Sequence, residues 1–189
     1  MPDIEQQKQE FLALCREHIH RDGLEELLAW LQKADFFTAP ASTRYHGAYA
    51  GGLCEHSIDV FRMAEKGMKG YELDLNTESV AISTLFHDLC KVNFYKTDKK
   101  NQKVNGEWVE VPYYTIEEKF VFGGHGSKSV FLVQQFMKLK TDEATAINCH
   151  MGAPPGGDAV RDAGNAFAAC PLAWLTHISD EAATYLLHR

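Results

Sequence analysis

The chain has 189 residues, 45% of them hydrophobic, which is the size of one ordinary globular domain with a buried core. Its formal net charge of −7 repels polyanions and so argues against a large surface for long nucleic acids. No stretch approaches the roughly 20 apolar residues of a membrane span, and the polar, acidic start lacks the pattern of a signal peptide, so we expect a cytoplasmic protein with no membrane partner.

The first part of the chain predicts three helices. Apolar residues at helical spacing from Ile4 to Ile19 indicate an amphipathic helix. Asp22 and Glu25 resemble a capping box, which predicts a second helix that continues through Leu31. After a loop with Pro and Gly residues, we expect a third helix from Leu53 to about Lys69.

A fourth helix is predicted in the middle of the chain, with Asn76 or Thr77 as its cap. Its apolar residues continue with little interruption to His87, so it should lie at the centre of the fold. Beyond it, the turn signal Asn105-Gly106 and the alternation around it predict a small β-hairpin insertion around residues 92–122. We interpret the four lysines of the segment KTDKKNQK as a solvated hairpin tip.

The last part of the chain predicts three further helices. The first runs from Gly126 to about Leu139, and Thr141 can cap the next, which ends near His150. The segment MGAPPGGDAVRDAGNAF is interpreted as a Gly- and Pro-rich loop. Pro171 is then expected to begin the last helix.

An adjacent pair, His87 and Asp88, at the end of the apolar run AISTLFHDLCK is the most informative feature of the sequence. A buried imidazole and a buried carboxylate both need partners that offset their desolvation, and a metal ion suits both. The alternative is a surface pair with scattered histidines, since the chain has nine His. Four further potential ligands lie on predicted helices or at their ends: His56, His125, His150 and Asp180.

Imidazole nitrogens and carboxylate oxygens suit Mn²⁺, Fe²⁺, Zn²⁺, Co²⁺ or Ni²⁺. The five cysteines are odd in number and form no C-x-x-C pair, so neither a disulfide framework nor a thiolate zinc site is predicted. One carboxylate can bridge two ions, and two-metal hydrolytic sites hold their ions about 3.5–4 Å apart around a water or hydroxide. Asp88 is the candidate for that bridge.

The order of these residues resembles the HD-domain superfamily of metal-dependent phosphohydrolases. The signature of that superfamily is a separated His, an adjacent His-Asp and a late Asp, which here are His56, His87, Asp88 and Asp180. The additional histidines, His125 in GGHGSKS and His150 in NCHMG, match those of binuclear members. HDLCK also resembles the usual HD-x-x-K, which gives Lys91 the position of a phosphate-contacting lysine.

Two longer strings extend the resemblance to bacterial and phage HD hydrolases, RYHGAYAGGLCEHS and HDLCKVNFY. The first is similar to the HD portion of a bacterial 3′-to-5′ exoribonuclease. The sequence shows no oligonucleotide-binding barrel ahead of the HD portion, so long RNA is not expected as a substrate. No GYP motif follows the His-Asp pair, so the cyclic-di-GMP hydrolysis of the HD-GYP branch is not expected either.

The resemblance implies an all-α fold, a single HD-domain helical bundle with the hairpin as an insertion. Residues 1–43 would form N-terminal helices that pack on a metal-binding core of residues 44–184. It also implies two divalent transition-metal ions. The first would be bound by His56, His87, Asp88 and Asp180, and the second by Asp88, His125 and His150.

We therefore expect a phosphomonoesterase or phosphodiesterase that acts on a nucleotide or other small phosphate ester through a metal-bridged hydroxide. Asp88, Lys91 and His46 are the expected catalytic residues, although a loop histidine bonded to backbone would explain His46 equally well. Arg44, Lys91 and His177 are expected to bind substrate, and a satisfied core histidine is the alternative for His177.

Two other functions use the same ligands. One is an iron-dependent HD oxygenase, which cleaves carbon bonds with mixed-valent iron and oxygen. The other is a non-catalytic module that binds a nucleotide as a sensor. A homodimer is compatible with each of these functions.

Overall fold

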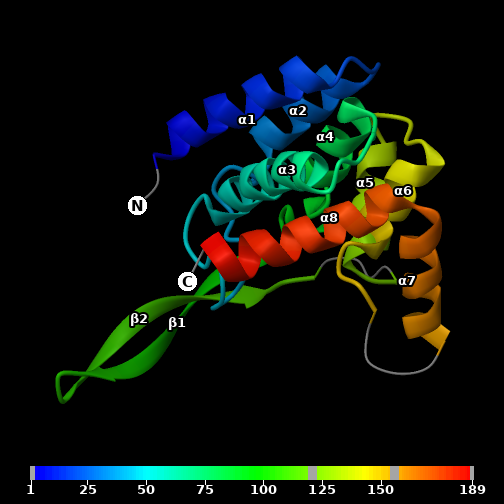
Figure 1. The fold of residues 1–189 in the computed structure, drawn as a ribbon. Helices are drawn as coiled ribbons and strands as arrows, with labels where there is room; N and C mark the ends of the chain where they lie inside the picture. Colours follow the sequence, from blue (N-terminus) through cyan, green and yellow to red (C-terminus); the bar gives the residue numbers. More distant parts are fainter. Residues whose placement is uncertain (1–2, 119–122, 154–157, 188–189) are drawn as a thin grey trace.

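The computed structural model describes residues 3–118, 123–153 and 158–187. In these residues the chain forms a bundle of helices from which one two-stranded hairpin projects (Figure 1). This confirms the predicted all-α fold with a hairpin insertion. Among the described residues, none of the helices combines the length and the apolar character that crossing a bilayer requires.

The first half of the bundle consists of α1 (Ile4–His18), α2 (Leu24–Lys33), α3 (Gly52–Gly70) and α4 (Thr77–Leu85). The predicted capping box at Asp22 is wrong, because α2 follows Gly23, which has a φ of 89° and makes no side-chain cap. A Cβ atom on Gly23 would lie 1.9 Å from the carbonyl oxygen of Phe136. The start of α2 is therefore determined by a close backbone approach that no local pattern reveals.

The helix α4 begins as predicted, because the side chain of Asn76 accepts a hydrogen bond from the backbone N–H of Ser79 at 2.9 Å. It ends earlier than predicted, at Leu85. His87 and Asp88 therefore lie in a turn, which leads into the short 3₁₀-helix η1 (Leu89–Lys91).

The hairpin consists of β1 (Tyr95–Val104) and β2 (Glu107–Ile116), which pair antiparallel in one register. The predicted turn is confirmed, since Asn105 and Gly106 have positive φ angles of 51° and 93°. The four lysines are exposed as predicted, but they lie along β1 instead of at the tip. Figure 1 shows the hairpin extending away from the helices.

The second half consists of α5 (His125–Gln134), α6 (Thr141–Cys149), α7 (Asp158–Ala169), α8 (Pro171–Ala182) and the π-helical turn η2 (Ala183–Leu187). Pro171 begins α8 as predicted. Thr141 is the first residue of α6 and not its cap, and α5 stops short of Leu139. The loop predicted for MGAPPGGDAVRDAGNAF is wrong from Asp158 on, because this part forms α7, whose five alanines favour a helix. Residues 154–157 of that segment lie outside the described residues.

The helix α8 lies across the middle of the bundle and packs against α3, α4, α6 and α7 (Figure 1). A larger core joins the first two helices to the rest, with Phe11 and Leu27 packed in the same cluster as Leu53, Leu85 and Ile147. A smaller core lies under α8. Packing in the larger core and in the smaller core together fixes the positions of α3, α6 and α8, and of the turn that follows α4.

Candidate metal centre

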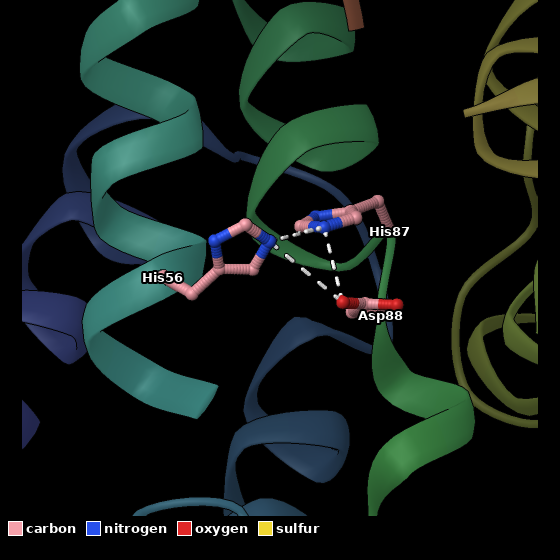
Figure 2. A group of neighbouring side chains, drawn as sticks. All are labelled: His56, His87 and Asp88. Carbon is pink, nitrogen blue, oxygen red and sulfur yellow. Dashed lines mark hydrogen bonds and ion pairs between the residues drawn. The ribbon is translucent and has the colours of Figure 1, made fainter. Parts of the chain in front are cut away.

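Three predicted ligands face one another in the interior. Figure 2 shows His56, from α3, directed at His87 and Asp88, from the turn after α4. The Nε2 atoms of the two histidines are 3.3 Å apart, and Asp88 Oδ2 lies 3.4 Å from His87 Nε2 and 3.8 Å from His56 Nε2. All three side chains are buried.

Asp180, on α8, is the fourth member of this group. Its Oδ1 atom lies 3.0 Å from His56 Nε2 and 3.9 Å from His87 Nε2. Metal bonds of about 2.0–2.2 Å to nitrogen or oxygen place neighbouring ligand atoms about 2.9–3.6 Å apart. The four side chains are therefore spaced much as the ligands of one ion would be.

His150 approaches the opposite oxygen of the same carboxylate. Its Nε2 atom lies 3.5 Å from Asp88 Oδ1, and its ring centroid is 4.9 Å from that of His87. The side chain is fully buried, yet Nε2 has no hydrogen-bond partner among the described residues. A buried nitrogen without a partner is costly, and a bound cation would satisfy it.

Two of the imidazoles are oriented by backbone carbonyls. His87 Nδ1 lies 2.7 Å from the Thr84 oxygen, and His150 Nδ1 lies 2.7 Å from the Ile147 oxygen. A carbonyl only accepts, so each Nδ1 must carry the proton that is donated, and in the neutral ring the lone pair is then on Nε2. This is the arrangement that histidine ligands of metal ions have in proteins.

His125, the first residue of α5, is more exposed than the other predicted ligands. Its Nδ1 atom lies 3.3 Å from Cys90 Sγ, and one ligand atom from each of His125, Cys90 and Asp88 falls in a group less than 4.8 Å across. Burial raises the pKa of the Cys90 thiol above its ordinary value. The structure thus brings all six predicted metal ligands into one cluster.

A glycine sets how closely the segments that carry His125 and His150 approach each other. A Cβ atom on Gly126 would lie 2.2 Å from the carbonyl oxygen of Asn148, so only glycine fits there without a backbone shift. Gly126 follows His125, and Asn148 lies two residues before His150. The contact therefore fixes the start of α5 against the end of α6.

Lys91, at the end of η1, forms an ion pair with the central carboxylate. Its Nζ atom lies 2.6 Å from Asp88 Oδ2. Burial alone would lower the pKa of Lys91, but the Asp88 carboxylate raises it above its ordinary value. Burial would raise the pKa of Asp88, but Lys91 and His87 hold it well below its usual range. Both side chains are therefore charged at neutral pH.

His46 lies beside the cluster, with its ring centroid 4.7 Å from that of His56. Its Nε2 atom is buried and has no hydrogen-bond partner among the described residues. Burial, together with the nearby His56 and Lys91, lowers the pKa of His46 to about 4. The ring is therefore neutral at neutral pH and presents an unpaired nitrogen.

The two other predicted substrate-binding residues contact groups other than the metal-binding side chains of the cluster. Arg44 is exposed, and its Nη2 atom lies 3.1 Å from the hydroxyl of Tyr45. His177 Nδ1 lies 2.7 Å from the backbone oxygen of His150, and its ring stacks on Phe167 at 5.0 Å. His177 thus supports the segment that carries a predicted ligand, and its role in substrate binding stays a prediction.

Sequence reasoning missed several residues that shape this centre. The carbonyls of Thr84 and Ile147 carry no signal in the sequence, because every residue has such a group. Gly126 is visible only as one of several glycines around His125. Cys90 stands two residues after Asp88, but spacing alone does not show where its thiol is directed.

Comparison with known proteins gives one family and two relatives. The profile of the HD domain family matches residues 53–183. Ribonuclease Y of Mycoplasmoides gallisepticum is 28% identical over 109 residues, which cover 58% of this chain and 16% of the relative. The dihydroneopterin 2′,3′-cyclic phosphate phosphodiesterase of Methanocaldococcus jannaschii is 37% identical over 57 residues, which cover 28% of this chain and 23% of the relative. The matched part is thus less than a quarter of either relative, and no solved structure matches the chain.

Proposed function

The chain belongs to the HD domain family, and we propose that it is a metal-dependent phosphohydrolase that acts on a small phosphate ester. The observation that carries this proposal is the position of Asp88. One of its oxygens faces His56 and His87, and the other faces His150. A carboxylate with imidazole nitrogens facing both of its oxygens is suited to join two cations.

Two divalent transition-metal ions, Mn, Fe, Zn, Co or Ni, fit these donors. The first would be held by His56, His87, Asp88 and Asp180, and the second by Asp88, His125 and His150. The unpaired Nε2 of His150 and the carbonyl-anchored rings support this assignment. When bound, such a pair of cations supplies positive charge to phosphoryl oxygens and lowers the pKa of water at the site.

Lys91 and His46 are the groups that would act on the substrate. The ammonium of Lys91 stays charged beside Asp88 and would stabilise negative charge on the phosphoryl oxygens or on the departing oxygen. His46 is neutral, so its unpaired Nε2 is suited to a hydrogen bond with the ester or with a water molecule. It is less suited to carry a proton to the leaving group, because few imidazolium ions exist at neutral pH.

A phosphodiester is the first substrate class to test, because one of the relatives is named as a cyclic phosphate phosphodiesterase. A nucleotide or a related small ester fits the net charge of −7 better than a long polyanion does, because repulsion grows with the length of the nucleic acid. Arg44 and His177 remain proposed contacts for that substrate.

The test compares the native protein with Asp88→Asn, which removes the charge but keeps the shape, and with Asp74→Asn at an exposed position as the control. Metal content is measured together with hydrolysis of an aryl phosphodiester, an aryl phosphomonoester and a panel of nucleotides. We expect Asp88→Asn to lose metal and at least about 10²-fold in rate, and Asp74→Asn to match the native protein. Equal rates in all three proteins would refute the proposal.

The same preparations discriminate the two other functions. Iron-dependent oxygen consumption that Mn²⁺ does not support would indicate an oxygenase. Tight nucleotide binding without turnover, with each of several metals, would indicate a sensor module. Hydrolysis that depends on Asp88 would exclude the sensor and support the hydrolase.

A further inference from the structure

Cys90 is the one sulfur atom in direct contact with the predicted ligands among the described residues. Its side chain is 2% exposed and lies on η1. The Sγ atom lies 3.3 Å from His125 Nδ1 and 3.7 Å from Asp88 Oδ1. Both His125 and Asp88 are proposed ligands of the second cation.

The distances match those between the ligands of one tetrahedral ion. Bonds of about 2.3 Å to sulfur and about 2.0–2.2 Å to nitrogen or oxygen place two ligand atoms about 3.3–3.7 Å apart. The separations from Cys90 Sγ to His125 Nδ1, from Cys90 Sγ to Asp88 Oδ1, and from Asp88 Oδ1 to His150 Nε2 are 3.3, 3.7 and 3.5 Å. Small side-chain shifts would therefore suffice to bind an ion.

An independent observation indicates that an ion belongs at this position. His150 Nε2 is fully buried and has no hydrogen-bond partner among the described residues. It approaches the same oxygen, Asp88 Oδ1, that the Cys90 thiol faces. Sulfur and unpaired nitrogen thus converge on one carboxylate oxygen.

We propose that the Cys90 thiolate is a ligand of the second cation, which is then held by one sulfur together with Asp88, His125 and His150. This inference rests on the two-cation centre of the proposed function. Binding breaks the S–H bond, releases the proton to solvent and forms the metal–sulfur bond, with no change in oxidation state.

A thiolate makes the two cation positions chemically unequal. The first has only nitrogen and oxygen donors, whereas the second gains a soft ligand that favours Zn²⁺, Co²⁺ or Fe²⁺ over Mn²⁺. Cys90 is well placed to act as a fixed ligand, because its backbone N–H donates to the Ser129 hydroxyl at 3.0 Å and so ties η1 to α5.

Cobalt(II) tests the proposal, because cobalt–thiolate bonds give a charge-transfer band in the near ultraviolet while visible bands report cobalt bound by any ligand. The metal-free native protein, Cys90→Ser and Cys90→Ala are titrated with cobalt and followed by absorption. Cys54→Ser is the matched control, since Cys54 is also buried but directs its thiol at the Gln7 carbonyl. Circular dichroism checks that each variant is folded.

We expect the charge-transfer band to appear with the second equivalent of cobalt, to be absent from both Cys90 variants and to persist in Cys54→Ser. The second equivalent should bind at least about tenfold more weakly without Cys90. Two bound cobalt ions without the band in the native protein would overturn the role of Cys90 and leave the two-cation centre intact. A band that survives in Cys90→Ala would also overturn it, and failure to bind cobalt at all would overturn the proposed function as well.

Discussion

Lys91 Nζ lies 2.6 Å from Asp88 Oδ2, the same oxygen that faces His87 and His56. The ammonium thus occupies the side of the carboxylate where the first cation is proposed to bind. A cation bound there would compete with Lys91 for that oxygen, which would leave the ammonium free to contact a phosphate group.

Lys91→Met should lower the rate of ester hydrolysis by about 10²–10³-fold, because a charged donor to the phosphoryl oxygens is lost. Bound metal should remain, since Lys91 is not a proposed ligand. Steady-state kinetics and metal analysis of the same sample measure both quantities. Lys99→Met is the control, because Lys99 pairs with Glu110 on the exposed hairpin. A loss of metal in proportion to the lost activity would show that Lys91 serves only to hold the site together.

Gly126→Ala should weaken binding of the second cation by about tenfold or more and leave the first in place. The added methyl group would push against the backbone of Asn148 and separate His125 from His150. Isothermal titration calorimetry with Zn²⁺ separates the two binding events. Gly164→Ala is the matched control, since a Cβ atom there meets nothing within 4 Å. If the second Zn²⁺ ion bound to Gly126→Ala as tightly as it binds to the native protein, the assignment of these histidines to one ion would be contradicted.

Arg21→Met should lower the free energy of unfolding by about 3 kcal/mol. Arg21 makes two hydrogen bonds to Glu143, whose side chain is fully buried, and one to Glu78. Its loss leaves a buried carboxylate without its main partner. Arg16→Met removes a similar two-bond pair with Glu25, but both side chains are more than half exposed, so a cost below about 1 kcal/mol is expected. Urea unfolding measures the free energy of unfolding of both variants. Similar losses in Arg21→Met and Arg16→Met would refute the role of burial.

Stability should fall in acid because of Glu143. Burial alone would raise the pKa of Glu143, but hydrogen bonds from Arg21, the Lys140 backbone and Ser79 hold it below its ordinary value of 4.5. The unfolded chain therefore binds a proton at a higher pH than the folded protein does, and stability is lost as the pH falls below about 5.

Glu143→Gln checks this effect, because the amide does not titrate. The native protein should be the more stable of the two at neutral pH, and the difference between their free energies of unfolding should shrink as the pH falls. Urea unfolding of the metal-free proteins at several pH values provides the comparison. A difference that does not change with pH would exclude Glu143 as the titrating group.

Shortening the hairpin should change little. Replacing residues 98–113 by Asn-Gly joins Thr97 to Tyr114, which are paired across the strands. Since the side chains of β1 beyond Tyr95 are exposed, we expect the free energy of unfolding to change by less than about 1 kcal/mol and hydrolysis of small esters to continue. Urea unfolding and kinetics test this. A loss of activity on a small ester would instead assign the hairpin to the active site.

The elements that the sequence predicted correctly have local causes. Asn76 caps α4, Asn105-Gly106 turns the hairpin and Pro171 begins α8, each through its own side chain or backbone preference. Some of the errors have causes that lie far away in the chain. Gly23, for example, begins α2 because the backbone of Phe136 approaches it closely.

The ligand set could be predicted because its residue types and their order along the chain are unusual. Both can be recognised in the sequence without knowledge of the fold. The way each ligand points could not be predicted. The turn that follows Leu85 directs His87 and Asp88 toward α3 and α6, whereas the sequence suggested a continuous helix. The contact of Cys90 with His125 likewise depends on how η1 packs against α5.

The unequal exposure of the histidines has a consequence for how quickly cations would be exchanged. His56 and His87 lie behind other side chains, whereas His125 stands at the open end of α5. An ion on the His125 side would have the shorter path to solvent, so a chelator would remove it first. A half-loaded protein would then persist for a time, with its inner ion retained and its outer position ready to refill.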